Sequence, residues 1–534
     1  MKMSGRRQMV PFLLGALSMI ISYTVYHNII IPQQKYAIQD DGSPIPTQGG
    51  RENFDEVYST TSHSLIKFEV SESNIQNALK ERLNDVGSRI KDVDKLLEER
   101  KREIGIDEEM VNLALKHKTS VKRLIQKFKE VLLMNRTFAL SVVGGSISVG
   151  AGVDGTPGIY ATTLGHYLTK MLGSEVTVEN GAVGATNSYY YGYCFETHCN
   201  VRKMDLLLWE FAHNDFGYPD GIYGQERLTR MILADLPNEP QLIYTNFLHG
   251  KQIDKESCEN SEKNGSVPLS KHYDVPSISM PDAVCKQVKE HRADYLLGSK
   301  DESHPGPNAH DMVGVFLAEF LKEVLIETIE ILEEQLSKGP TTSRGSIKEY
   351  ILEDVKPDFK TWNDEELHQK LLPPVLFNTT AITHPQCWSL LGSEYRPSEM
   401  AFMPQEKLGW TKFNIKKRDD RTDLKAVWRT LQPDAVLEFA FSIPKYRDLN
   451  CTIAITTITS ENNECGRAKV FLDDEYITLI DCMHRYLITL VHEVALNVPP
   501  GRHTLKITSV DKEGFNVAAV SAAFEIPDDE LEKM

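Results

Sequence analysis

Between residues 137 and 338, short apolar runs alternate with helix-length stretches, and each run ends in a polar or glycine-rich segment. Four of these runs have the length of a strand: Phe138–Val143, Val176–Glu179, Met204–Phe211 and Gln241–Phe247. Amphipathic stretches such as Tyr160–Leu172 lie between them, and a long helix over Met312–Leu336 is expected to close the block. This alternation predicts an α/β domain over residues 133–340, with a mostly parallel sheet covered by helices.

After Asn378 the pattern changes to short runs without helices between them. The runs are Val436–Phe441, Thr452–Ile458, Lys469–Leu472, Tyr486–Val491, His503–Ile507 and Phe515–Phe524. Many short strands in succession predict a β-sandwich of the jelly-roll kind over residues 376–530. Residues 341–375, rich in charge and proline, are expected to link the two domains.

Residues 9–31 are nearly all apolar, and no charged residue occurs between positions 8 and 34. As a helix these residues would reach about 34 Å, enough to cross a bilayer. Three basic residues precede the segment, which favours a cytoplasmic amino terminus: Lys2, Arg6 and Arg7. A signal peptide cut near Ala16-Leu17-Ser18 is the alternative, but the apolar stretch is longer than a typical signal core. Residues 1–35 are therefore expected to be a cytoplasmic tail and an uncleaved signal anchor.

The rest of the chain is expected on the luminal or extracellular side, in the Golgi, the endoplasmic reticulum or at the cell surface. Four N-glycosylation acceptors follow the anchor: Asn135, Asn264, Asn378 and Asn450. All eight cysteines also follow it, and none forms a Cys-X-X-Cys pair typical of zinc sites, so structural disulfides are expected. Four cysteines precede residue 300 and four follow residue 380, enough for each domain to close two bridges of its own.

Residues 36–132 are expected to form a polar tether followed by a helical stem. From about residue 71 the apolar positions follow steps of three and four, the spacing of a coiled-coil seam. The seam residues are Leu83, Val86, Ile90, Val93 and Leu97. A homodimer through this stem and a helix that leans on the next domain are both open. Gly105 is expected to break the stem before a second helix over residues 107–133.

The net charge bears on the partner. Lys and Arg number 59 against 76 Asp and Glu, a net charge of −17. Phosphate backbones would repel such a chain, which argues against a nucleic-acid partner.

Polar motifs follow the predicted strands, at the edge where ligands gather in α/β sheets. Ser146 follows the first strand within Gly144-Gly145-Ser146, and two glycines permit a tight turn that exposes the hydroxyl at a helix start. Gly184 ends the next loop, where a bare backbone N–H can approach a developing oxyanion. Asn214 follows the third strand and offers a neutral amide donor.

Asp301-Glu302-Ser303-His304-Pro305 precedes the closing helix. A carboxylate three residues before a histidine can meet the ring Nδ1, while Nε2 faces a nucleophile. Taken singly, each of these residues has an ordinary explanation as a turn, a cap or a surface side chain. Their joint occurrence in this order favours a serine-based esterase.

These blocks resemble the SGNH (GDSL-type) hydrolase family over about residues 144–310. The resemblance implies a flavodoxin-like three-layer domain and acyl-enzyme chemistry with no metal or organic cofactor. It implies Ser146 as nucleophile, His304 as general base and Asp301 as the group that orients the base. The oxyanion hole would comprise the Ser146 N–H, the Gly184 N–H and the Asn214 side chain. The chain departs from the family pattern at two positions, with Gly145 in place of Asp and Ala212 in place of Gly.

The predicted sandwich carries aromatic residues that could stack on sugar rings or belong to its core: Trp388, Trp410, Trp428, Tyr446, Tyr476 and Tyr486. Together with the anchor, they favour an O-acyl ester, above all O-acetyl, of a glycan as the substrate. A lipid esterase, a sugar O-acyltransferase and an inactive scaffold that binds glycans remain open.

Overall fold

The parallel sheet is present and contains five strands in the order β2-β1-β3-β4-β5. The strands are β1 Phe138–Gly144, β2 Val176–Asn180, β3 Leu206–Glu210, β4 Gln241–Asn246 and β5 Ser277–Ser279. All neighbours pair in parallel, and the order is that of flavodoxin-like domains. The predicted parallel α/β domain is thereby confirmed; β5 was not predicted.

The structure is a computed structural model, and it describes the following residues: 72–153, 156–216, 221–234, 236, 238–248, 266–290, 303–338, 376–377, 381–395, 404–414, 426–446, 449–459, 465–484 and 488–526. Residues Leu79–Met534 form one compact unit. The predicted anchor (1–35), the tether and the linker (341–375) lie outside the described residues. Within the described part, no helix is both long and apolar enough to cross a membrane.

Helices cover both faces of the sheet. One face packs against α3 Glu108–Ala114, α4 Lys122–Met134, α6 Tyr160–Leu172, α12 Met280–Glu290 and α14 Pro307–Lys338. The other packs against α7 Ser188–His198, α9 Gly221–Ala234 and α11 Ser266–Tyr273. Short helices, α5 Ser146–Val149 and α8 Ala212–Phe216, follow β1 and β3 directly.

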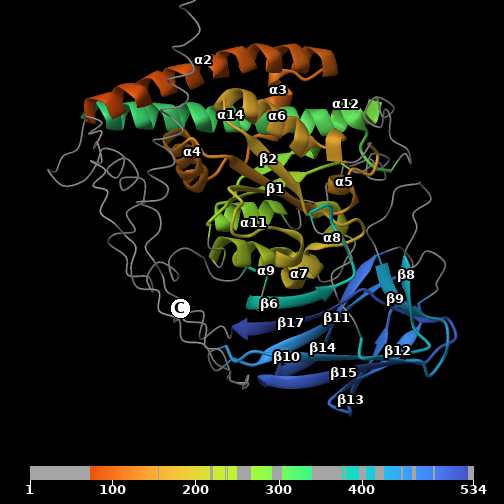
Figure 1. The fold of residues 1–534 in the computed structure, drawn as a ribbon. Helices are drawn as coiled ribbons and strands as arrows, with labels where there is room; N and C mark the ends of the chain where they lie inside the picture. Colours follow the sequence, from red (N-terminus) through yellow and green to blue (C-terminus); the bar gives the residue numbers. More distant parts are fainter. Residues whose placement is uncertain are drawn as a thin grey trace, which may run out of the picture. The chain divides into compact units, whose positions relative to one another are not determined.

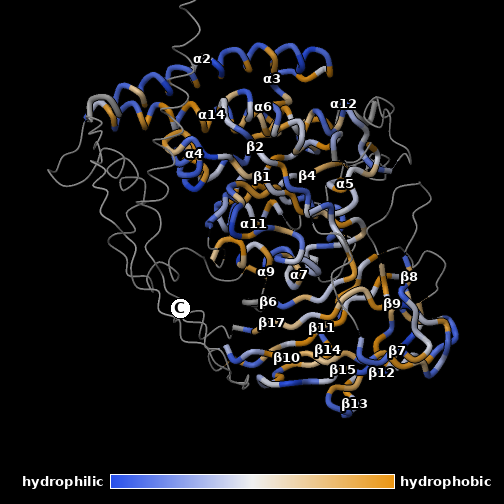
Figure 2. The backbone as a smooth tube through the Cα atoms, viewed as in Figure 1, coloured by the Kyte–Doolittle hydropathy of each residue, from blue (hydrophilic) through white to orange (hydrophobic). Residues whose placement is uncertain are grey.

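The stem helix α2, Glu72–Ile104, lies along α14 (Figure 1). It is largely hydrophilic (Figure 2), yet all five seam residues are buried in the same core as α14. Lys101 pairs with Glu319 at 3.0 Å, and Lys322 of α14 pairs with Asp94 at 2.5 Å. The seam therefore packs within its own chain, and a dimer through this face would require α2 to detach.

The stem breaks at Gly105, as predicted, where φ is +73°. The single helix expected over residues 107–133 is wrong, because α3 and α4 are separate helices. Asp107 caps α3 by accepting a hydrogen bond from the Met110 N–H at 2.8 Å.

The carboxyl-terminal domain is a sandwich of sheets with the strand orders β13-β12-β15-β10-β7, β14-β11-β17-β6 and β16-β9-β8. Its strands are β6 Ala381–Ser389, β7 Glu406–Leu408, β8 Thr411–Asn414, β9 Ala426–Thr430, β10 Val436–Ile443, β11 Cys451–Ile458, β12 Arg467–Leu472, β13 Glu475–Asp481, β14 Thr489–Val498, β15 Gly501–Ser509, β16 Phe515–Val517 and β17 Ala519–Ile526. The single strand predicted over Phe515–Phe524 is two strands in different sheets. The four-stranded sheet shares a buried core with α7 and α9.

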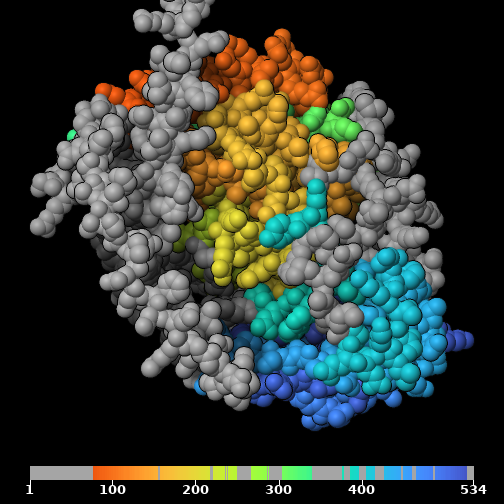
Figure 3. Space-filling model, in the orientation of Figure 1, coloured from red at the N-terminus to blue at the C-terminus, as the bar shows by residue number. Residues whose placement is uncertain are grey.

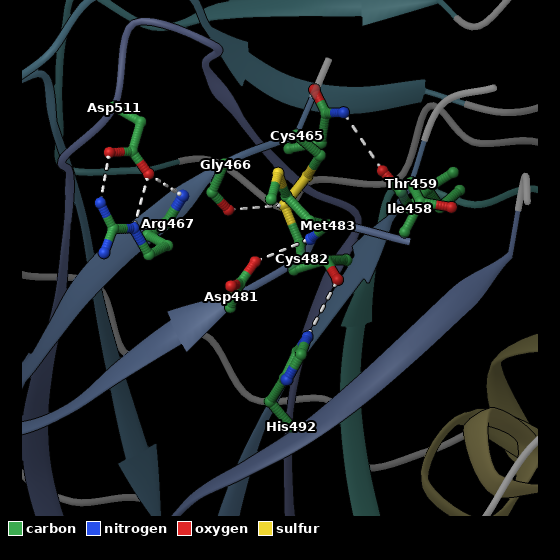
Figure 4. The surroundings of a disulfide bond; sticks show 12 residues. Ile458, Thr459, Cys465, Gly466, Arg467, Asp481, Cys482, Met483, His492 and Asp511 are labelled. Carbon is green, nitrogen blue, oxygen red and sulfur yellow. Dashed lines mark hydrogen bonds and ion pairs between the residues drawn. A yellow bond between two sulfur atoms is a disulfide. The ribbon is translucent and has the colours of Figure 1, made fainter. Parts of the chain in front are cut away.

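The disulfides do not divide between the domains. Cys194 on α7 is bonded to Cys387 on β6, which joins the α/β domain to the sandwich. Cys465 and Cys482 form a second bridge beside the Arg467–Asp511 ion pair (Figure 4). The expectation that each domain closes its own two bridges is therefore wrong. Of the others, Cys199 and Cys451 are buried free thiols, Cys258 lies outside the described residues, and the Cys285 side chain is not described.

Candidate active site

A tight turn at the end of β1 presents Ser146. The strand ends at Gly144, Gly145 is the N-cap, and Ser146 is the first residue of α5. A Cβ atom on Gly144 would lie 2.5 Å from Ser148 Oγ and 2.8 Å from the Glu210 carbonyl oxygen. The turn therefore requires glycine at position 144 because neighbouring atoms occupy the space of a side chain.

His304 reaches the same point from the other end of the domain. Its Nε2 lies 2.7 Å from Ser146 Oγ, although 158 residues separate them. With the ring proton on Nδ1, Nε2 can accept a hydrogen bond from the serine hydroxyl, and with the proton on Nε2 the ring nitrogen donates instead. The structure thus joins the predicted nucleophile to the predicted base at hydrogen-bond distance. Asp301 lies outside the described residues.

Gly152 allows the His304 segment to approach the turn. Its φ is +90°, and a Cβ there would collide with the Pro305 carbonyl oxygen and lie 3.0 Å from His304 Cβ. The sequence analysis did not single out Gly152, because only the folded chain brings it against residues 304–305.

Gly184 lies in the loop after β2, beside the end of β1. The N–H of its neighbour Val183 donates to the Gly144 carbonyl at 3.2 Å. Within the described residues, the backbone N–H groups of Ser146 and Gly184 donate to no protein acceptor. Two donors thus remain available near the Ser146 hydroxyl, as an oxyanion hole requires.

Asn214, in α8, extends this set of donors. One hydrogen of its Nδ2 is donated to the Thr186 carbonyl at 2.8 Å, which fixes the orientation of the amide and leaves the second hydrogen. A Cβ on Gly145 would lie 2.6 Å from both Cγ and Nδ2 of Asn214. The departure from the SGNH pattern at Gly145 therefore leaves room for the Asn214 amide next to Ser146.

Three buried ionisable groups surround this site and were not proposed from the sequence. Glu210 ends β3, and burial raises its pKa to about 8, against the effect of the Ser148 hydroxyl, which donates to Oε2 at 3.3 Å. Burial likewise raises the pKa of Asp215 to about 7, although the Ser188 N–H donates to its Oδ1 at 2.9 Å. Burial, and next the nearby His304, lower the pKa of His310 to about 3. The raised pKa values keep the two carboxyls protonated to higher pH, and the lowered pKa keeps His310 uncharged to lower pH. All three side chains are therefore uncharged over a wider pH range than usual.

The aromatic residues of the sandwich are mostly core. Trp410 and Trp428 are buried among Leu437 and Phe515, so the alternative that they belong to the core is confirmed for these two. Trp388 and Tyr446 are half-buried against the same core. Tyr476 is 54% exposed, and Tyr486 lies outside the described residues.

The second domain also reaches the edge of the sheet where β2 ends. The Tyr395 N–H donates to the carbonyl of Asn180 at 3.2 Å. In Figure 3 the teal segment after β6 lies against the yellow and gold surface of the α/β domain. Both domains therefore contribute backbone near the carboxyl ends of β1 and β2.

The remaining expected sites are peripheral. Asn135 and Asn450 are exposed, as glycan acceptors must be, whereas Asn264 and Asn378 lie outside the described residues. No group of His, Cys, Asp and Glu side chains in the described part is arranged to hold a metal ion.

The chain is similar to solved esterase structures, although no protein-family model and no curated protein matches it. A two-domain esterase (CEX) active on acetylated mannans, crystallised with mannopentaose, aligns with 14% identity and a TM-score of 0.54. The match covers 78% of this chain and 98% of that one. The same esterase crystallised without the sugar aligns with 16% identity and a TM-score of 0.53 over 78% and 99% of the two chains. An acetyl xylan esterase, AlAXEase, aligns with 34% of this chain at 16% identity and a TM-score of 0.29.

The mannan esterase match covers 78% of this chain and so spans both the α/β domain and the sandwich, and the motifs within the α/β domain resemble those of the SGNH family. The chain has the two-domain fold of the esterase active on acetylated mannans.

Proposed function

We propose that this protein is a serine esterase that removes O-acyl groups, above all O-acetyl groups, from glycans. The observation that carries the proposal is the 2.7 Å contact between Ser146 Oγ and His304 Nε2 at the carboxyl edge of the sheet. A serine hydroxyl at this distance from an imidazole nitrogen can attack an ester carbonyl as the imidazole accepts its proton.

The mechanism follows from the position of each group. Ser146 Oγ bonds to the acyl carbon while its proton moves to His304 Nε2. The N–H groups of Ser146 and Gly184 and the free Asn214 Nδ2 hydrogen stabilise the oxyanion. The bond between the acyl carbon and the sugar oxygen breaks, and His304 returns the proton to that oxygen, which leaves as the sugar hydroxyl. Water then attacks the acyl-enzyme with His304 as base, which releases acetate and restores Ser146. Asp301 is assigned to hold the His304 Nδ1 proton.

The substrate class is supported by the two-domain arrangement. The similar two-domain esterase acts on acetylated mannans, and this chain also joins an α/β domain to a β-sandwich. We assign the anchor to residues 9–31 and the catalytic domain to the luminal or extracellular side, where the substrate would be an acetylated polysaccharide or glycoprotein glycan.

Acetate release tests the proposal. The full-length protein and a Ser146→Ala variant are incubated with acetylated glucomannan, acetylated xylan and p-nitrophenyl esters of increasing chain length. The proposal expects acetate from a glycan, a preference for the acetyl ester and a loss of at least about a thousandfold in the variant.

Each other outcome of this experiment would favour one of the alternative functions. A preference for long-chain esters indicates a lipid esterase. Acyl transfer to an added sugar without net hydrolysis indicates an acyltransferase. Equal rates for the wild type and Ser146→Ala would rule out a hydrolase that uses Ser146 and leave a dedicated transferase or a binding scaffold.

A further inference from the structure

The loop that carries Gly184 is held by a strand of the other domain. The Thr489 N–H, at the start of β14, donates to the Ala185 carbonyl at 3.0 Å. The Asn187 Nδ2 donates in return to the Thr489 carbonyl at 3.2 Å. One residue of the sandwich thus binds the two loop residues on either side of Thr186.

The middle residue of this loop binds the site itself. The Thr186 carbonyl accepts the 2.8 Å hydrogen bond from Asn214 Nδ2. The three residues that follow Gly184 are therefore fixed in turn by Thr489, Asn214 and Thr489. A displacement of this loop would move the Gly184 N–H and turn the Asn214 amide, two of the three oxyanion donors.

The loop needs outside support because its backbone is strained. Ala185 has a φ of +59°, a left-handed conformation that a residue with a Cβ seldom adopts. Such a conformation persists where neighbouring contacts outweigh its cost. The reciprocal hydrogen bonds with Thr489 are contacts of this kind.

The strand that supplies Thr489 is firmly anchored. Four residues further along β14, the Glu493 carboxylate accepts hydrogen bonds from Tyr189 and Tyr193 at 2.6 Å and from Arg227 at 3.0 Å. The Cys194–Cys387 disulfide adds a covalent link from α7 to the same sheet. Asn187 caps α7, since its Oδ1 accepts the Tyr190 N–H at 3.0 Å, so loop, helix and strand form one connected support.

We propose that β14 of the sandwich positions the oxyanion side of the active site, with Asn187 and Thr489 as the positioning residues. The inference rests on the proposed esterase function. On this inference the sandwich is a structural part of the catalytic unit, independently of whether it binds a glycan. Neither residue touches the reacting atoms; both act through the position of Gly184 and Asn214.

The test compares two asparagine variants in the full-length protein. Asn187→Ser keeps an oxygen that can cap α7 but is too short to reach the Thr489 carbonyl. Asn238→Ser is the matched control, because Asn238 Nδ2 also donates to a backbone carbonyl, that of Met204, before the start of β3 and away from the site. Thr489→Pro removes the reciprocal N–H donor at the first residue of an edge strand, where proline is tolerated.

The expected result separates positioning from stability. Asn187→Ser and Thr489→Pro should lower kcat for p-nitrophenyl acetate about tenfold or more with KM little changed. They should also weaken binding of a phenylboronic acid, a mimic of the tetrahedral intermediate, by a similar factor. Asn238→Ser should lower the melting temperature without either effect. Equal kcat for Asn187→Ser and Asn238→Ser would overturn the inference.

A readout independent of catalysis distinguishes the two proposals. Amide hydrogen exchange over residues 183–187 should be faster in Asn187→Ser than in the wild type and in Asn238→Ser. If the wild type hydrolyses no ester, the proposed function fails while the exchange data still show whether β14 restrains the loop. Unchanged exchange in Asn187→Ser would refute the restraint itself.

Discussion

The Asn214 side chain occupies the space that a side chain at position 145 would need: a Cβ atom on Gly145 would come within 2.6 Å of the Asn214 Cγ and Nδ2 atoms. The family that the motifs resemble usually has Asp before the nucleophile. This chain has glycine at that position, and the Asn214 amide group lies against its backbone beside Ser146. The departure from the usual sequence pattern at Gly145 is therefore compatible with the proposed role of Asn214 as an oxyanion donor.

Restoring the family residue at position 145 should damage the site. Gly145→Asp would displace the Asn214 amide, and the loss of one oxyanion donor typically lowers kcat by about 10²–10³. Steady-state hydrolysis of p-nitrophenyl acetate measures this effect. Gly87→Ala is the control, since a Cβ at Gly87 meets nothing within 4 Å. Wild-type activity in Gly145→Asp would show that Asn214 has no part in catalysis.

The buried carboxyl of Glu210 should make stability fall as the pH rises. Burial raises its pKa from 4.5 to about 8, so between these values the folded protein binds a proton that the unfolded chain releases. The free energy of unfolding should decline over this range and level off above pH 8. Glu210→Gln should flatten the decline, whereas Glu475→Gln, at an exposed position, should not. Urea unfolding at pH 5, 6.5 and 8 checks this, and parallel wild-type and Glu210→Gln curves would contradict it.

The ion pair between Glu493 and Arg227 should make the free energy of unfolding fall as the pH is lowered, the opposite of the effect of Glu210. Burial alone would raise the pKa of Glu493, but Arg227 and the two tyrosine hydroxyls hold it below its usual value. Its stabilising contribution is therefore present above about pH 4.5 and lost as the pH falls further. Glu493→Gln should cost roughly 3 kcal/mol at pH 7, because Arg227 is left buried without a counter-charge. Thermal unfolding at pH 7 and pH 3.5 should show that this difference narrows in acid.

The cross-domain disulfide should stabilise the assembly of the two domains. Replacing both Cys194 and Cys387 with Ser removes a link across 193 residues, for which a loss of about 2–4 kcal/mol is typical. The matched pair Cys465→Ser and Cys482→Ser opens a loop of only 17 residues and should leave the domain contact unaffected. Limited proteolysis that releases the sandwich only from the first double variant would support this. Equal release from both variants would count against it.

Sequence reasoning succeeded where a local pattern carries the information. Strands β1, β3 and β4 were predicted because buried parallel strands form largely apolar runs, and polar motifs mark their ends. The edge strand β2 is mostly half-exposed, and it was predicted from a short run that leads into a glycine-containing segment. Strand β5 has three residues and leaves too little pattern to detect. The break at Ala518 between β16 and β17 was missed because the apolar run is continuous there.

The positions of Ser146 and His304 were deduced from motif order, but the contacts around them depend on long-range packing. Nothing near Cys194 in the sequence indicates Cys387 as its partner, since pairing cannot be deduced from cysteine positions. Two other contacts likewise join segments that are distant in the sequence: Gly152 lies against Pro305, and the Thr489 N–H donates to the Ala185 carbonyl. The seam of α2 was read correctly as an apolar stripe, but its partner, α14, lies more than 200 residues away.

Covalent labelling tests the central claim, that Ser146 is a nucleophile activated by His304. The full-length protein is treated with a fluorophosphonate, and the modified peptide is identified by mass spectrometry. We expect a single adduct on Ser146, formed at least about a hundredfold more slowly in His304→Ala and absent in Ser146→Ala. An adduct on another residue, or labelling of Ser146 that is as fast without His304, would contradict the account.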